Sequence, residues 1–354
     1  MNSEAEPLRF AIIGCGVIGS THADAIAAVP GVRLIAVADS VAAKAQALGV
    51  RCKVAVFDDP QRMLDQEKPD VVCVCTPSGM HGAHACVAMR AGAHVVVEKP
   101  MEITLRAIDE MLRVQAETGR KMAVISQHRF DEASVRVHAL AREGAFGRLV
   151  LGNAHIPWWR SQEYYDSGAW RGTWALDGGG VLMNQSIHSI DLLSWLIGPV
   201  HSLHAYTDTL AHRMETEDTA VAVLRFANGA LGTIAATTGA YPGVTTRIEL
   251  FGDTGSAIIA DDRLAYLHLA RDDREPVGPY GRAPEPIASS TGATGASKPA
   301  LSAATTHAAQ IADMARAIRE DDTPALDGVG ARHAVAIILG IYESARTGRE
   351  VVLA

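Results

Sequence analysis

The stretch from Leu8 to Asp39 constrains the fold of this chain more than any other part of the sequence. It contains an apolar run, the sequence Gly14-Cys15-Gly16-Val17-Ile18-Gly19, a helical run, a second apolar run and an acidic residue. Between a strand and a helix, the first glycine of such a pattern allows a tight turn and the second lets an anion approach the backbone. The third permits close packing of helix on strand. The stretch therefore predicts a βαβ unit that binds a dinucleotide, rather than a structural glycine turn in an unrelated α/β protein.

Asp39 indicates which dinucleotide is expected. It ends the second apolar run, at 32–38, about 20 residues after the glycines. A carboxylate there accepts hydrogen bonds from both ribose hydroxyls and repels a 2′-phosphate. Ser40-Val41 supplies no neighbouring arginine, although Lys44 follows closely enough to reach a phosphate. We therefore expect NAD as the cofactor, with NADP less favoured.

The first third of the chain alternates apolar strands with helical stretches. Further strands are expected at 53–57, 71–75, 94–98 and 121–126, and helices at 41–48, 60–66, 80–90 and 104–118. Continuous apolar strands that alternate with helices are typical of a parallel sheet covered on both faces. The fold class is therefore α/β, with a doubly wound parallel sheet in a domain spanning 1–127.

The pattern changes after about residue 128. A helix at 131–143, a strand at 148–156 and a helix at 181–197 precede hairpin signals at Asn228-Gly229 and Asp253-Thr254-Gly255. We expect a second, α+β domain at 128–354 with an open, mostly antiparallel sheet. Helices at 306–319 and 330–347 end the chain, and the last is a candidate to pack back on the first domain. Residues 271–299 read as a long loop, either a lid or a disordered excursion.

Composition limits the partners of this chain. It has 354 residues, 48% of them hydrophobic, and a formal net charge of −8, which argues against nucleic acid. No apolar run approaches a membrane span, and the N-terminus lacks the features of a signal peptide, so a cytoplasmic location is expected. The odd number of cysteines and the apolar surroundings of Cys73 and Cys75 favour reduced core thiols over a metal site. An uncovered sheet face would favour a homodimer or homotetramer, unless the later helices cover it.

Two short motifs follow strands and are predicted to lie at one edge of the sheet. Thr76-Pro77 follows the strand at 71–75, and Glu98-Lys99-Pro100 ends the strand at 94–98. Ligands of open parallel sheets bind beyond the carboxyl ends of the strands, so both motifs are expected beside the glycine turn. Burial there would lower the pKa of a lysine and suit Lys99 to acid–base chemistry. A lysine considered alone would be a solvated surface residue; the flanking Glu98 and Pro100 favour the catalytic interpretation.

A polar stripe marks the helix expected at 181–197. Asn184, His188 and Asp191 are spaced i, i+4 and i+7, which places them on one face of an α-helix. Three polar groups on an otherwise apolar helix need a partner, either a ligand or interdomain hydrogen bonds. Both interpretations stay open for Asp191, whereas His188 titrates near neutral pH and is the candidate acid or base.

An aromatic segment lies between these motifs. It contains Trp158-Trp159-Arg160, Tyr164-Tyr165 and Trp170-Arg171-Gly172-Thr173-Trp174. Aromatic faces with interleaved charged groups suit the apolar faces and hydroxyl edges of a sugar, although packing of a loop on the core accounts for at least one tryptophan.

Together these motifs resemble the Gfo/Idh/MocA family, which includes glucose–fructose oxidoreductase and inositol dehydrogenase. The resemblance covers the chain nearly end to end, through the glycine turn, Thr76-Pro77 with His81, Glu98-Lys99-Pro100 and the segment 178–191. It implies an N-terminal Rossmann domain and a C-terminal domain whose open sheet is used in dimers or tetramers. It also implies nicotinamide-dependent oxidation or reduction of sugars and cyclitols.

The resemblance also assigns roles to residues. The family's catalytic lysine corresponds to Lys99 and its catalytic histidine to His188. Many members carry Asp four residues before that histidine, where this chain has Asn184, which cannot accept a proton. Trp170-Arg171 is similar to a pair that contacts the cofactor in some members. The segment 170–193 also resembles nucleotide-sugar and glycoside 3-dehydrogenases of the family.

The expected site residues fall into three groups. Catalysis is expected from Lys99, His188 and Asn184. Cofactor contacts are expected from Gly14, Gly16, Val17, Ile18, Gly19, Asp39, Ser40, Thr76, Pro77, His81, Glu98, Lys99, Gln127, Trp170 and Arg171. Substrate contacts are expected from Lys99, Arg129, Trp158, Arg160, Tyr165, Trp174, Asn184 and His188, and the arginines leave room for an acidic substrate such as a uronate.

The resulting hypothesis is an NAD-dependent dehydrogenase that oxidises a secondary hydroxyl of a sugar, sugar derivative or cyclitol to a ketone. Lys99 or His188 would remove the hydroxyl proton. Two alternatives stay open: an NAD-dependent glycoside hydrolase on the same fold, and a non-catalytic regulator that senses a dinucleotide.

Overall fold

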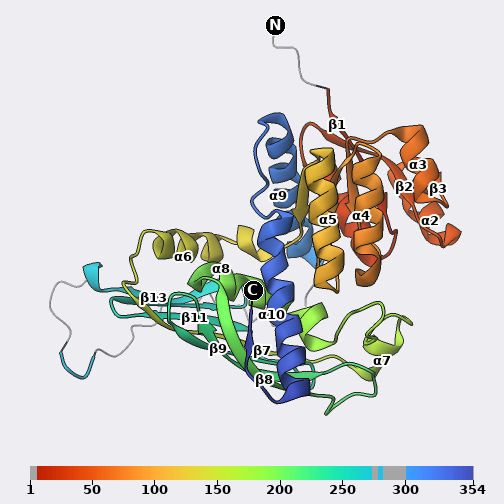
Figure 1. Ribbon diagram of the computed structural model, residues 1–354. Helices are drawn as coiled ribbons and strands as arrows, with labels where there is room; N and C mark the ends of the chain where they lie inside the picture. Colours follow the sequence, from red (N-terminus) through yellow and green to blue (C-terminus); the bar gives the residue numbers. More distant parts are fainter. Residues whose placement is uncertain (1–5, 273–277, 282–299, 354) are drawn as a thin grey trace, which may run out of the picture. The chain divides into compact units, whose positions relative to one another are not determined.

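The computed structural model describes residues 6–272, 278–281 and 300–353, and only the backbone of residues 272 and 300–304. The chain forms two compact units, each assembled from three segments (Figure 1). The first contains described residues of Met1–Gln127, Ala175–Gly178 and Pro299–Val335; the second contains those of His128–Trp174, Gly179–Lys298 and Ala336–Ala354. The long loop expected at 271–299 falls almost entirely outside the described residues.

The first unit is built on a six-stranded parallel sheet, as the alternating sequence predicts. Its strand order is β3-β2-β1-β4-β5-β6, so the direction of winding reverses between β1 and β4. The strands are β1 (Leu8–Ile13), β2 (Val32–Ala38), β3 (Ala55–Phe57), β4 (Val71–Val74), β5 (His94–Val97) and β6 (Met122–Val124). All four residues of β4 are buried, because a parallel sheet covered on both faces has no solvent side.

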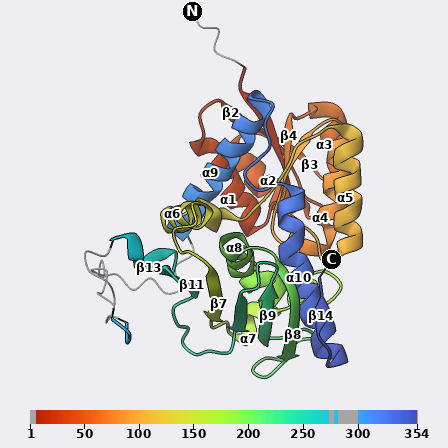
Figure 2. The same ribbon diagram turned by 60° about the vertical axis from the view of Figure 1, so that its left-hand side comes forward.

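Helices cover both faces of this sheet (Figure 2). They are α1 (Val17–Ala28), α2 (Ala42–Cys52), α3 (Pro60–Glu67), α4 (His81–Arg90), α5 (Leu105–Thr118) and α9 (Ala300–Arg319). A hydrophobic core joins β1, β2 and β4 to α1, α2 and α9, while α4 packs against α5 and α3. Thr104 caps the N-terminus of α5, its hydroxyl accepting a hydrogen bond from the Ala107 amide at 3.2 Å. Strands and helices lie within a few residues of their predicted bounds.

The second unit contains an eight-stranded, mostly antiparallel sheet. Its order is β13-β12-β11-β7-β10-β9-β8-β14, and only β7 and β10 pair in parallel. The strands are β7 (Leu149–Pro157), β8 (Val200–Asp208), β9 (Thr219–Phe226), β10 (Leu231–Thr237), β11 (Arg247–Gly252), β12 (Gly255–Ala260), β13 (Arg263–Leu269) and β14 (Val351–Val352). Asn228-Gly229 turns between β9 and β10 as predicted, with Gly229 at φ 89°. Strands β8, β13 and β14 were not predicted.

Helices α6 (Glu132–Arg142) and α8 (Ile187–Ile197) pack on one face of this sheet (Figure 1). The short α7 (Gln162–Asp166) lies in the aromatic segment, and α10 (Gly328–Thr347) ends in this unit. Along β9, buried and exposed residues alternate, so the sheet's other face carries exposed apolar side chains such as Val221 and Val223. Among the described residues, no helix is long and apolar enough to cross a membrane.

The helix expected at 181–197 is not one regular α-helix. Residues Val181–Ser186 form a π-helix, and α8 begins only at Ile187. A π-turn contains more than 3.6 residues, so Asn184 does not share the α-helical spacing that His188 and Asp191 keep. The prediction of one regular α-helix over 181–197 is therefore wrong, although all three polar residues remain in the same segment.

Candidate active site

The glycine turn has the geometry that anion binding requires. Gly14 has φ 98°, and a Cβ there would lie 2.5 Å from the Cys75 carbonyl oxygen. A Cβ on Gly19 would lie 2.1 Å from the Gly14 carbonyl oxygen, so helix α1 needs glycine to pack this closely. A Cβ on Gly16, in contrast, would meet no atom of the described chain within 4 Å. The second glycine therefore faces open space at the N-terminus of α1, where a pyrophosphate would approach the backbone.

Asp39 has a structural role that sequence reasoning missed. One of its carboxylate oxygens accepts a hydrogen bond from the Cys15 amide and the other accepts one from the Val41 amide, both at 2.8 Å. Asp39 thus ties the glycine turn to the end of β2. Each carboxylate oxygen has a further lone pair, so these bonds leave capacity for ribose hydroxyls.

Thr76, Pro77 and His81 stand at the carboxyl end of β4. Thr76 has a buried hydroxyl with no hydrogen-bond partner among the described residues. Such a hydroxyl is able to bind a ligand. His81 is 1% exposed, and its two ring nitrogens lie 2.7 Å from the Pro100 carbonyl oxygen and 2.9 Å from that of Thr76. His81 therefore holds the loops after β4 and β5 together.

Glu98 and Lys99 follow β5 at the same edge of the sheet. Glu98 is 4% exposed, and its carboxylate accepts hydrogen bonds from His22 at 2.8 Å and His307 at 3.2 Å through one oxygen. Its other oxygen accepts the Lys99 amide at 3.0 Å. Lys99 is half-buried. Glu98 is thus hydrogen-bonded within the protein, and Lys99 follows it at the sheet edge that carries the glycine turn.

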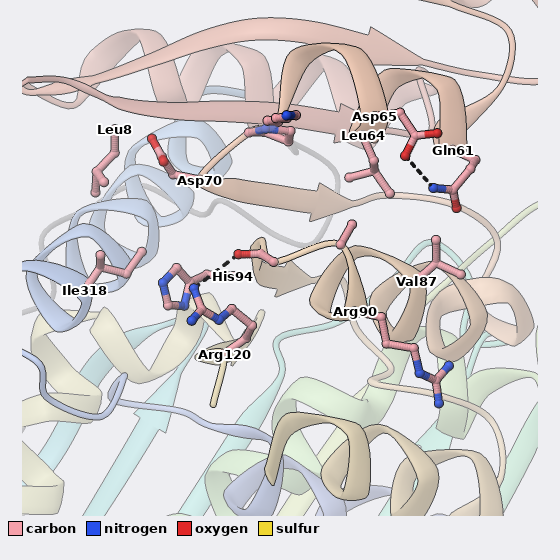
Figure 3. Close-up of a pocket in the computed structure, with 14 residues that line it drawn as sticks. Leu8, Gln61, Leu64, Asp65, Asp70, Val87, Arg90, His94, Arg120 and Ile318 are labelled. Carbon is pink, nitrogen blue, oxygen red and sulfur yellow. Dashed lines mark hydrogen bonds between the residues drawn. The ribbon is translucent and has the colours of Figure 1, made fainter. Parts of the chain in front are cut away.

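A pocket of the first unit lies at the opposite edge of the sheet. This pocket of about 780 Å³ is formed near the amino ends of the strands, where Leu8 begins β1 and His94 begins β5 (Figure 3). Its lining also includes Gln61, Leu64, Asp65, Lys68, Pro69, Asp70, Val87, Arg90, Ala91, Gly92, Arg120 and Ile318. Because the glycine turn, Thr76 and Lys99 all follow carboxyl ends, this pocket is not the dinucleotide site.

In the second unit the aromatic segment forms a stacked cluster. The Arg171 guanidinium lies over the rings of Tyr164 and Trp170, at 4.5 and 4.6 Å from their centroids, and donates to the Tyr164 hydroxyl at 2.8 Å. Arg160 lies 5.0 Å from the Trp158 ring. These stacked planes present apolar faces beside hydrogen-bonding groups.

Other members of this segment are engaged in packing. Tyr165 is 5% exposed, and its hydroxyl lies 2.7 Å from that of Thr238. Trp174 donates its indole N–H to the Glu215 carbonyl at 3.0 Å but stays 47% exposed. Trp174 therefore keeps part of its apolar surface exposed, whereas Tyr165 packs in the interior.

Arg129 and Asp191 form an ion pair within the second unit. The guanidinium donates two hydrogen bonds to the carboxylate, at 2.7 and 2.6 Å, and both side chains are nearly buried. The pair neutralises both charges, which answers the open question about Asp191 with a structural role. It also reduces the charge that Arg129 offers to an acidic substrate.

His188 lies next to a second histidine that the sequence did not single out. The rings of His188 and His128 meet edge to face, with their centroids 5.0 Å apart. The Nδ1 atom of His128 lies 2.9 Å from Asp131 and 3.0 Å from Asp262. Burial opposes protonation of His128, but the two carboxylates outweigh it and raise its pKa to about 10. His188 therefore has a protonated imidazole as a neighbour.

A buried carboxylate supports the π-helix that carries Asn184. Glu217 accepts hydrogen bonds from the amides of Gly180 and Leu182 and from the Tyr342 hydroxyl, at 2.9–3.0 Å. Burial raises the pKa of Glu217 to about 7 even though these bonds favour its ionised form. In the sequence Glu217 is one of two consecutive acidic residues before a strand, and nothing in that pattern marks it as buried.

The first unit is thus a dinucleotide-binding domain with a lysine at its ligand edge, and the second carries histidine, amide and stacked aromatic groups. The open space at Gly16 and the orphan hydroxyl of Thr76 fit a bound dinucleotide.

Family models confirm and extend this class. Residues 8–126 match the oxidoreductase family with an NAD-binding Rossmann fold, and residues 134–258 match the GFO/IDH/MocA C-terminal domain. The chain belongs to the GFO/IDH/MocA family and is an NAD-binding oxidoreductase.

Several individual relatives of the chain are dehydrogenases. It is 33% identical to the D-glucoside 3-dehydrogenase of Escherichia coli, over 57% of this chain and 58% of that enzyme. It is 27% identical to the inositol 2-dehydrogenase of Rhizobium meliloti, over 75% of this chain and 79% of that enzyme. Among solved structures, it is similar to the WlbA dehydrogenase from Bordetella pertussis in complex with NADH and UDP-GlcNAcA. That similarity has 33% identity, 99% coverage of both chains and a TM-score of 0.86.

Proposed function

We propose that this protein oxidises a secondary hydroxyl of a sugar, sugar derivative or cyclitol to a ketone, with NAD as the hydride acceptor. The observation that carries the proposal is Lys99, which follows buried Glu98 at the sheet edge where Gly16 is open to a pyrophosphate. Relatives named as glucoside and inositol dehydrogenases support the class of substrate. Bound NAD supplies an acceptor for the hydride that leaves the substrate carbon.

In this proposal the chain's own residues handle the proton. Lys99 or His188 takes the hydroxyl proton, and a protonated Lys99 stabilises negative charge that develops on the substrate oxygen. Asn184 orients the hydroxyl through its amide, because it cannot accept a proton. Protonated His128 disfavours a second positive charge on adjacent His188, which favours the neutral imidazole that a base requires.

The other expected contacts with the cofactor and the substrate are part of the same proposal. Asp39 takes the ribose hydroxyls and makes NADP the poorer cofactor because its charge repels a 2′-phosphate. Exposed Trp174 and the stacked cluster around Tyr164 offer faces to a sugar ring. The domain division at 127/128, a cytoplasmic location and self-association through the eight-stranded sheet are part of this proposal as well.

The first test replaces Lys99 with alanine. In Lys99→Ala we expect turnover to fall by about 10²-fold or more, because general acid–base catalysis contributes this much, while NAD affinity is retained. Turnover is measured as NADH absorbance with a panel of sugars, cyclitols and nucleotide sugars, and NAD affinity by calorimetry. The matched control is Lys121→Ala, since Lys121 lies at the amino end of β6 and pairs with Asp321. Unchanged turnover in Lys99→Ala would remove this residue from the mechanism.

The same panel separates the alternatives. A dehydrogenase accumulates NADH with a substrate. An NAD-dependent glycoside hydrolase releases an aglycone without net NADH, and a dinucleotide-sensing regulator does neither. The family match and the dehydrogenase relatives favour the first outcome.

A further inference from the structure

A buried cluster of one carboxylate and two imidazoles lies next to Lys99 in the first unit. It consists of His22 from α1, Glu98 after β5 and His307 from α9, which are 0%, 4% and 3% exposed. These elements are distant in the sequence, yet the three side chains meet at one carboxylate oxygen. The two rings are set edge to face, 5.3 Å apart at their centroids.

The hydrogen bonds fix the protonation pattern of the cluster. Burial alone would raise the pKa of Glu98, but the two histidine bonds hold it well below its usual range, so the carboxylate is ionised. Burial lowers the pKa of His22 despite its bond to Glu98, so His22 is neutral. An imidazole that meets an ionised carboxylate must donate, and therefore His22 and His307 carry their protons on Nε2. The Nδ1 atom of His22 has no hydrogen-bond partner among the described residues.

This pattern argues against a metal ion at the cluster. Two histidines and a glutamate are a familiar ligand set, but a metal-bound histidine normally donates its other ring N–H to an acceptor. His22 offers no such second bond within the described chain. The other titratable groups that face the carboxylate are the Cys73 and Cys75 thiols on and after β4, whose pKa values burial raises, so they are neutral. Glu98 is therefore the ionised carboxylate of the cluster, beside a neutral His22 and two neutral thiols.

The second carboxylate oxygen of Glu98 binds the backbone of the candidate catalytic lysine. One oxygen of Glu98 takes both histidines, and the other accepts the Lys99 amide at 3.0 Å. A charge-assisted hydrogen bond of this kind is stronger and more directional than a neutral one. The histidines keep the carboxylate from rotating, and the carboxylate keeps the Lys99 peptide in place.

We propose that His22, Glu98 and His307 form a positioning unit that sets the direction of Lys99. None of the three touches the reacting atoms; they act through the Lys99 peptide. Because His307 lies on α9, the unit makes the orientation of Lys99 depend on a helix about two hundred residues away in sequence. The catalytic part of this inference rests on the proposed function, whereas the hydrogen-bond pattern does not.

The test uses Glu98→Gln and His307→Gly in the full-length protein. Glutamine keeps the shape of Glu98 but replaces one acceptor oxygen with a donor, so it cannot accept from Lys99 and both histidines at once. We expect kcat to fall roughly 30- to 100-fold, as a small misplacement of a reacting group does, with KM for NAD within about threefold. In His307→Gly, added imidazole should fill the vacated space and restore at least part of kcat.

A second measurement does not depend on turnover. In the wild-type protein the Lys99 amide proton should resonate downfield and exchange slowly in NMR spectra, and both properties should be lost in Glu98→Gln. The matched control is Gln310→Leu, since Gln310 lies on the same face of α9 and binds Ser126 and Val124 instead. That variant removes two hydrogen bonds of α9 that lie outside the cluster, so it should leave the Lys99 amide signal and kcat near wild type.

The outcomes separate this proposal from the proposed function. The positioning unit is overturned if Glu98→Gln leaves the Lys99 amide signal unchanged and kcat within twofold of wild type. It is also overturned if Gln310→Leu lowers kcat and weakens the Lys99 amide signal as much as His307→Gly does. The wild-type protein could fail to reduce NAD with every sugar, cyclitol and nucleotide sugar of the panel, while the Lys99 amide signal still behaves as expected. In that case the dehydrogenase proposal fails and the hydrogen-bonded unit stands.

Discussion

At the scale of single residues, the second unit holds several charged groups in ion pairs within its own structure. His128 is held by Asp131 and Asp262 while its ring contacts His188. Arg129 is paired with Asp191 in the same unit. His128 thus meets the ring of the candidate base as a protonated imidazole.

The raised pKa of His128 predicts a pH dependence of stability. Its folded-state pKa of about 10 lies above the unfolded value near 6.5, so its contribution is complete below pH 6.5 and is lost as pH rises through 10. Between pH 6.5 and 10 the free energy of unfolding should fall by on the order of 2 kcal/mol more in the wild-type protein than in Asp262→Asn. The value is kept this small because solvent screens the exposed Asp262. Urea unfolding at several pH values measures this. Parallel curves for the two proteins would contradict it.

At the scale of elements, the sequence predicts the first unit better than the second. Continuous apolar strands and capped helices identify β1–β6 and α1–α5 because a sheet buried on both faces leaves a strong pattern. The π-helix at Val181–Ser186 was hidden because apolar residues there also satisfy an α-helical period. Strand β8 mixes buried and polar positions, which made it look like a loop. The Glu98 cluster was invisible because its histidines belong to separate helices.

Packing at the start of the π-helix predicts a strict requirement for glycine. A Cβ on Gly180 would lie 1.8 Å from the Glu217 carbonyl oxygen, which belongs to the backbone and cannot move aside easily. Gly180→Ala should therefore lower the free energy of unfolding by about 3 kcal/mol or more, as backbone clashes in tight sites do. Gly278→Ala, where a Cβ meets nothing in the described chain within 4 Å, is the control. Equal stability of the two variants in urea unfolding would refute the argument.

At the scale of the whole molecule, the two units are interleaved along the chain, since each is assembled from three segments. A boundary near residue 127 matches the first point at which the chain passes from one unit to the other. The brief return at Ala175–Gly178 and the passage of α10 from one unit to the other leave no trace in hydrophobic patterning. The eight-stranded sheet also leaves an apolar stripe exposed, with Tyr206 beside Val221 and Leu231 beside Leu151.

This stripe predicts self-association. Covering it with a second copy would remove apolar surface from water, so a charge in its middle should prevent assembly. Val223 is 55% exposed at the centre of β9, and we expect Val223→Lys to shift a dimer or tetramer toward monomer in analytical ultracentrifugation. Val329→Lys, at a site 66% exposed in the first unit, is the control. A monomeric wild-type protein would rule this interface out.

The two amide contacts of Asp39 bear on any attempt to change cofactor preference. Its carboxylate anchors the turn that receives the pyrophosphate and also the residues after β2. Removing the side chain to admit a phosphorylated dinucleotide would loosen the same turn that must grip it. Engineers of such a variant should keep an oxygen acceptor at this position and place the compensating positive charge elsewhere, for which Lys44 on α2 offers a starting point.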